Sequence, residues 1–156
     1  MTYVFDSTCF RILGNFYPGR FPAVWTNLDG MVAEGRLLSV REAFKELDHS
    51  GTKEYVRKWI KLNKTIFVLP TEEETLFVSE IFKVPHFQYM VGHKQLLVGT
   101  PVADPFLVAC AKVRRACLVT DEASKPNSAR IPIVCSHFKV DCITLEEFME
   151  QEGWEF

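Results

Sequence analysis

Several sequence patterns that define common protein classes are missing from this chain. It has no GxxxxGK[ST] segment for binding nucleotide phosphates, and no GxGxxG segment follows its first apolar stretch. No apolar run approaches the roughly 20 residues that cross a bilayer, and the first residues lack the basic and apolar parts of a secretory signal. We therefore expect neither a P-loop enzyme nor a dinucleotide-dependent dehydrogenase, and we expect a cytoplasmic protein with no membrane partner.

The chain also lacks a strong excess of either charge. Its 156 residues include 20 acidic and 18 basic side chains, which gives a formal net charge of -2 at pH 7. This balance argues against binding nucleic acid through bulk positive charge, so any nucleic-acid site must be local. Hydrophobic residues make up 47% of the chain, which is enough to predict a substantial core and no disorder.

The cysteines do not suit a disulfide framework. Their number, five, leaves one thiol unpaired in any scheme, and they lie among apolar neighbours in the sequence. Their spacing also differs from the close CxxC pairs of structural zinc sites. We expect reduced cysteines that pack in the core, namely Cys9, Cys110, Cys117, Cys135 and Cys142.

Short apolar segments alternate with amphipathic ones along the chain. Strands are predicted at 3–5, 65–69, 117–120 and 140–143. Helices are predicted after residue 6, at 23–34, 41–47 and 52–62, after residue 71, from residue 104 and at 145–153. This alternation is typical of a three-layer α/β/α sandwich around a parallel sheet of four or five strands. No linker divides the chain, so residues 1–156 are expected to form one domain.

Polar residues at the predicted starts of helices are expected to cap them. Ser39 or Ser50 is available for the helices near them. Thr71 and Glu74 match a capping box, in which each side chain bonds the backbone of the other residue. Asp104 is expected to cap the helix that has Pro105 in its first turn.

Acidic residues follow two of the predicted strands. Asp6 follows the strand 3–5, and Asp121 and Glu122 follow the strand 117–120. Asp104 begins a helix that returns toward the same edge, where open α/β sheets bind ligands. Clustered carboxylates repel one another unless a divalent cation neutralises them, and oxygen ligands suit Mg²⁺ or Mn²⁺. The pattern therefore favours metal-assisted attack of water on a phosphodiester.

Each of these acids also has an ordinary structural interpretation. Asp104 suits a helix cap, and Asp6 or Asp121 suits a turn after a strand. Glu42 and Glu46 are four residues apart, which also describes a solvated helix face. Position alone therefore leaves the function undecided.

Segments along nearly the whole chain together resemble a small PIN-like protein family. These segments are YVFDSTCF, YPGRFPAVW, SVREAFKEL, ADPFLVACAK with LVTDE behind it, and RIPIVCSHFKVDCIT. PIN domains are metal-dependent nucleases with a parallel sheet between helices, and many are the toxin ribonucleases of VapC-type toxin and antitoxin pairs. The resemblance therefore implies a metal-dependent ribonuclease toxin that acts on RNA, with an antitoxin protein as a possible partner and a homodimer as a possible assembly.

The resemblance also assigns roles to individual residues. It makes Asp6, Glu46 and Asp104 the first three metal-binding acids, and the last acid is either Asp121 or Glu122. Supporting polar positions beside these acids are matched by Ser7, Thr8 and Thr120. The bound ion is expected to be Mg²⁺ or Mn²⁺. A non-catalytic PIN-like module that binds RNA or protein remains the alternative.

Local cations and aromatic side chains are the remaining candidates for contact with RNA. Lys125 and Arg130 lie in the loop that carries the last acid, so they are expected to contact phosphates. A solvated helix face is the preferred interpretation of Lys112, Arg114 and Arg115. Side chains near Asp6 that could stack on bases, or could pack in the core of this Phe-rich chain, are Phe10, Phe16 and Tyr17.

Overall fold

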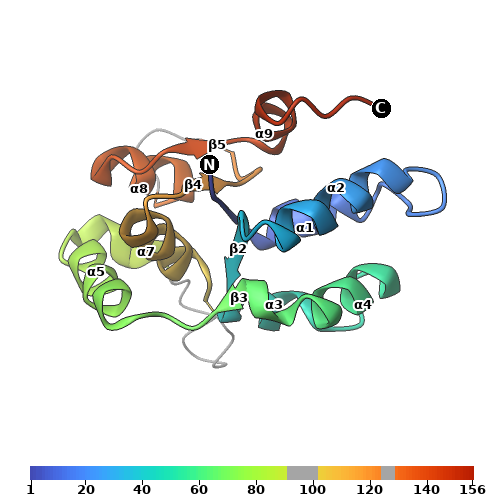
Figure 1. Cartoon of the computed structure of the whole chain (residues 1–156). Helices are drawn as coiled ribbons and strands as arrows, with labels where there is room; N and C mark the ends of the chain where they lie inside the picture. The colour runs from blue at the N-terminus through green and yellow to red at the C-terminus, as the bar shows by residue number, and fades with distance from the viewer. Residues whose placement is uncertain (91–101, 124–128) are drawn as a thin grey trace.

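The centre of the molecule is a parallel β-sheet (Figure 1). A computed structural model of the chain describes residues 1–90, 102–123 and 129–156. Its five strands lie in the order β3-β2-β1-β4-β5, and every neighbouring pair is parallel. The strands are β1 (Tyr3–Phe5), β2 (Leu37–Val40), β3 (Phe67–Val68), β4 (Cys117–Val119) and β5 (Cys142–Ile143). The predicted α/β class and parallel sheet are confirmed.

Helices cover both faces of this sheet, as Figure 1 shows. The described α-helices are α1 (Ser7–Leu13), α2 (Pro22–Ala33), α3 (Arg41–Leu47), α4 (Glu54–Leu62), α5 (Glu72–Phe82), α7 (Asp104–Arg114), α8 (Ile131–Phe138) and α9 (Leu145–Gln151). Side chains alternate between the faces of a strand, so Tyr3 and Phe5 pack toward α1, α2, α4 and α9, whereas Val4 packs toward α5, α7 and α8. The predicted three-layer sandwich is therefore present.

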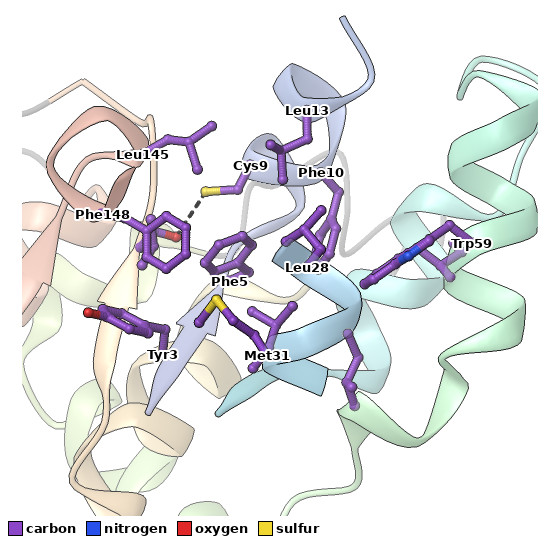
Figure 2. Close-up of a cluster of buried hydrophobic side chains, with 14 of the residues drawn as sticks. Tyr3, Phe5, Cys9, Phe10, Leu13, Leu28, Met31, Trp59, Leu145 and Phe148 are labelled. Atoms are coloured by element: carbon purple, nitrogen blue, oxygen red, sulfur yellow. Dashed lines mark hydrogen bonds between the residues drawn. The ribbon is translucent and has the colours of Figure 1, made fainter. Parts of the chain in front are cut away.

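The core on the first face is largely aromatic (Figure 2). The ring of Phe148 in α9 meets the rings of Tyr3 and Phe5 edge to face, with centroids 4.8 and 4.9 Å apart. Phe10 in α1 lies 5.6 Å from Phe5. The thiol of Cys9 donates a hydrogen bond to the carbonyl of Val119 at 3.2 Å. These contacts fix α1 and α9 against β1 and β4, next to the carboxyl ends of both strands.

An ion pair between a buried carboxylate and an exposed arginine joins two helices on the second face. Glu74 in α5 is 1% exposed and accepts a hydrogen bond from Nε of Arg114 in α7 at 2.7 Å. Glu74 also accepts from the backbone N–H of Thr71 at 2.8 Å, while the Thr71 hydroxyl accepts from the backbone N–H of Glu74. The predicted capping box is confirmed. Arg114 is exposed, as expected for a solvated helix face, and it also ties α7 to α5.

Three elements differ from the sequence prediction. A 3₁₀ turn, η1 (Lys64–Ile66), occupies the start of the predicted strand 65–69, so β3 has only two residues. The apolar segment 37–40 is a strand because it pairs with both β1 and β3. Helix α8 was not predicted, because Pro132 in its first turn follows a polar loop that obscures the helical pattern.

Two predicted caps are wrong. Ser39 lies inside β2, where its hydroxyl donates to the carbonyl of Phe5 at 2.7 Å, and Val40 and Lys53 precede α3 and α4 in place of Ser39 and Ser50. Asp104 is the first residue of α7 and makes no side-chain capping bond, because Ala103 occupies the cap position. The carboxylate of Asp104 is therefore left for another role.

The cysteines and the surface agree with the composition. All five cysteines are free thiols, four of them buried and Cys142 half-buried, as expected for reduced core residues. A second 3₁₀ segment, η2 (Pro85–Met90), adds Phe87 and Met90 to the core of the second face. No helix in the described ranges has both the length and the apolar character needed to cross a membrane.

Replacing Phe148 by alanine is expected to destabilise the first core. The ring is fully buried against β1, so its removal leaves a cavity and should lower the free energy of unfolding by about 3–5 kcal/mol. Leu62→Ala is the control, because Leu62 is 85% exposed and its loss should cost less than about 0.5 kcal/mol. Chemical denaturation measures both values, and equal effects would contradict this packing.

Candidate acidic site

The strand order reverses beside β1. Strands β2 and β3 lie on one side of β1, whereas β4 and β5 lie on the other. Asp6 follows β1 and its backbone N–H donates to the carbonyl of Val119 in β4 at 3.0 Å. Thr120, which follows β4, is therefore brought next to Asp6. This is the switch point at which open α/β sheets bind ligands, as predicted for this edge.

Hydroxyl groups from both strand ends hold the carboxylate of Asp6. Asp6 is only 3% exposed, and its Oδ2 accepts hydrogen bonds from the hydroxyls of Thr8 at 2.9 Å and Thr120 at 2.8 Å. Thr120 Oγ1 in turn accepts the backbone N–H of Glu122 at 3.1 Å. No Lys, Arg or His side chain of the described ranges forms an ion pair with Asp6. Its charge is met by neutral donors alone.

Glu46 reaches the same place from α3. Its Oε2 accepts from the hydroxyl of Ser7 at 2.8 Å, and its Oε1 accepts from the backbone N–H of Ala103 at 3.2 Å. Burial raises the pKa of Glu46 and the negative charge of Asp6 adds to this effect, whereas the two hydrogen bonds oppose it. Glu46 thus links α1 to the start of α7. The alternative of a solvated helix face is wrong for this residue.

Asp104 shows most clearly that the acids converge. It is half-buried at the start of α7, and burial together with the negative charges of Asp6, Glu122 and Glu46 raises its pKa to about 8. Burial is the larger cause of this rise, and the nearby like charges add to it. The acids at positions 6, 46, 104 and 122 therefore act on one another, although they come from four separate segments of the chain.

Glu122 and Asp121 point to different surroundings. Burial raises the pKa of Glu122 and the charge of Asp6 raises it further, whereas a hydrogen bond from the backbone N–H of Ile131 and the charge of Arg130 lower it. Asp121 Oδ1 instead accepts from the backbone N–H of Leu145 at 3.2 Å, at the start of α9. The sequence left the choice between these two acids open. The geometry groups Glu122 with the other acids.

The residues predicted to contact RNA lie in different surroundings. Arg130 immediately precedes α8 and is close enough to Glu122 to affect its pKa. Lys125 lies outside the described residues. Phe10 is buried in the core, whereas Phe16 is half-buried and Tyr17 is 53% exposed. The core interpretation therefore holds for Phe10 and not for Tyr17.

Two backbone donors at the site were missed by sequence reasoning. The N–H groups of Ala103 and Ile131 bind Glu46 and Glu122 at the starts of α7 and α8. No side-chain pattern identifies a backbone donor. Pro105 and Pro132 mark the first turns of α7 and α8, however, and could have indicated where free N–H groups lie.

The donor set fits a hard divalent cation in chemistry and charge. It consists of carboxylate oxygens, which Mg²⁺ and Mn²⁺ prefer as ligands, and the nearby cations Arg11 and Arg130 offset only part of the effect that raises the pKa of Glu46 and Glu122. Within the described ranges, however, no three Asp, Glu, His or Cys side chains are already arranged as ligands of one ion. The acids are thus near enough to repel one another and are not gathered around a single point.

Fold and site together define an α/β protein with an acidic site at the switch point of a parallel sheet. The chain belongs to the DUF4411 family, described as a domain of unknown function, which matches residues 3–156. No curated protein and no solved structure matches the chain.

The raised pKa of Asp104 predicts how stability depends on pH. In the unfolded chain this carboxyl titrates near pH 3.8, whereas in the folded chain it titrates near pH 8. Between these values the folded state binds more protons, so stability should fall as pH rises from about 4 to 8 and level off above. Asp104→Asn should reduce this slope and stabilise the protein at pH 8 in chelator, whereas the raised pKa values of Glu46 and Glu122 keep part of the slope.

Thermal and chemical denaturation across this pH range measure the effect. Asp141→Asn is the matched control, because Asp141 is an exposed acid at the amino end of β5, opposite the sheet edge that carries the site, and should leave the curve nearly unchanged. Parallel curves for the native chain and Asp104→Asn would contradict the repulsion at Asp104.

Proposed function

We propose that this protein is a metal-dependent ribonuclease that hydrolyses RNA phosphodiester bonds. The observation that carries the proposal is the pKa of Asp104, raised to about 8 by burial and by Asp6, Glu122 and Glu46. Keeping several carboxylates together costs stability, and four separate segments contribute to the cluster. Such a cost is typical of a functional site and is not needed for a core that is already well packed.

Asp6, Glu46, Asp104 and Glu122 would hold one or two Mg²⁺ or Mn²⁺ ions. Such ions supply Lewis-acid activation of water and neutralise charge on the phosphate. The acids themselves serve as ligands more than as proton shuttles. Ser7, Thr8 and Thr120 orient the carboxylates of Asp6 and Glu46 through the hydrogen bonds described above.

RNA is the proposed substrate because of the resemblance to PIN-like proteins. Arg130 lies near Glu122, at the edge of the site, and Lys125 belongs to the same loop in the sequence. Both are proposed to contact phosphates on the strand that enters the site. The same resemblance proposes that the protein is the toxin of a toxin–antitoxin pair, in which an antitoxin protein would cover the acidic site.

Neutral substitutions of two acids test the proposed activity. Asp6→Asn and Asp104→Asn should each lower Mn²⁺- or Mg²⁺-dependent RNA cleavage by at least about 100-fold, because each removes a charged ligand and keeps the side-chain size. Asp141→Asn, at the opposite edge of the sheet, should cleave like the native chain. Circular dichroism confirms that each variant is folded, and cleavage is followed on single-stranded and structured RNA.

The outcomes separate the competing functions. Undiminished cleavage by both site variants would refute the assignment of these acids. RNA binding by the native chain without cleavage under any divalent ion would favour the non-catalytic module.

The role of Thr120 provides an independent test of positioning. Thr120→Val removes the hydroxyl that bonds Asp6 Oδ2 at 2.8 Å and keeps the side-chain shape, so metal affinity should fall about 10- to 100-fold. Thr120→Ser keeps the hydroxyl and should restore most of this affinity. Titration with Mn²⁺ by calorimetry measures both variants. Equal loss in both would mean that the methyl group, and not the hydrogen bond, is required.

A further inference from the structure

An apolar groove opens beside the acidic site. It has a volume of about 620 Å³, which is in the range of small-molecule sites, and Thr120 and Glu122 line it. The groove is therefore continuous with the acidic site. Its apolar lining comes from Ile12 in α1, Phe16 shortly after α1, Ile143 in β5, and Leu145 and Met149 in α9.

The rim of the groove is acidic. Asp121, Glu122, Glu146 and Glu147 all line it, and no Lys, Arg or His is found among its described lining residues. A phosphate group inside the groove would be repelled by these carboxylates, and none of the described lining residues is a cation that could compensate. Ionised carboxylates only accept hydrogen bonds, so a ligand of this groove needs an apolar body and donor groups at its edge.

Aromatic rings extend from the groove onto the surface. The ring of Phe16 meets that of Phe21 edge to face at 5.3 Å, and Phe21 is 37% exposed. Phe156, which is 58% exposed, lies 6.4 Å from Phe16. Exposed rings of this kind offer flat faces on which nucleobases stack.

We propose that the groove holds an unpaired nucleobase that carries an exocyclic amino group. This inference rests on the proposed ribonuclease function, in which the adjoining phosphate lies at the acidic site. Adenine, cytosine and guanine each offer an exocyclic amino group to the rim carboxylates, whereas uracil offers only a ring N–H between two carbonyl oxygens that the carboxylates repel. The groove would therefore select which base flanks the cleaved bond.

Free nucleosides test the groove separately from catalysis. In ¹H–¹⁵N NMR titrations of the full chain, cytidine and adenosine should shift signals of α1 and α9 and should bind about tenfold more tightly than uridine. Glu146→Gln should reduce this discrimination, because an amide also donates hydrogen bonds. Glu150→Gln is the control, since Glu150 lies on the same helix and does not line the groove. Met149→Gln should weaken every nucleoside by making the floor polar.

The results distinguish this inference from the proposed function. RNA cleavage with equal or absent binding of all nucleosides would overturn the base site and leave the nuclease intact. Selective nucleoside binding without cleavage would keep the base site and reject the nuclease. The inference would be overturned if nucleosides left the signals of α1 and α9 unshifted, sedimentation showed a dimer, and Met149→Gln dissociated that dimer. The groove would then belong to the interface with a second copy of the chain.

Discussion

The central constraint in this protein is the mutual repulsion of carboxylates that the sheet order brings together. Asp6 is bonded to both strand ends at the switch point, and the negative charges of Asp6, Glu46 and Glu122 all act on Asp104. Such an arrangement destabilises the fold at neutral pH and needs a rigid frame around it. The rest of the structure can be understood as that frame.

Two cores on opposite faces of the sheet supply the rigidity. On one face, Phe148 and Cys9 fix α9 and α1 against the strands whose ends carry Asp6 and Thr120. On the other, the ion pair of the buried Glu74 with Arg114 ties α5 to α7, the helix that begins with Asp104. Each acid is therefore attached to an element held by core packing, so that repulsion alone does not move the acids apart.

The groove beside the acids follows from the same arrangement. Helix α9 packs over the end of β4 through Leu145 and Phe148, and this leaves apolar side chains next to Glu122. The acidic rim and apolar floor are thus two parts of one surface. A phosphodiester at the acids and a base in the groove would use both parts at once, which is why the two proposals are linked.

The sequence predicted the architecture better than the details of the site. Alternating apolar segments indicated a parallel sheet, and the acids after the segments 3–5 and 117–120 indicated the edge at which the carboxylates lie together. The choice of Glu122 over Asp121 was not predictable, since it depends on hydrogen bonds to Ile131 and Leu145 from distant segments.

The helix α8 and the groove were missed for a similar reason. A polar loop obscured the start of α8, and the groove forms only where α1 meets α9, more than a hundred residues away in the chain. Contacts of this kind are set by tertiary packing, which no local pattern records. The resemblance to PIN-like proteins supplied Glu46, whose spacing alone suggested a solvated helix face.

Anomalous diffraction from crystals of the protein soaked in Mn²⁺ tests the central claim most directly. The account predicts an anomalous peak between Asp6, Asp104 and Glu122, with Glu46 beside it, that is absent in crystals of Asp104→Asn. The account would be contradicted if, at a saturating concentration of Mn²⁺, these four carboxylates held no metal and manganese bound only elsewhere on the molecule.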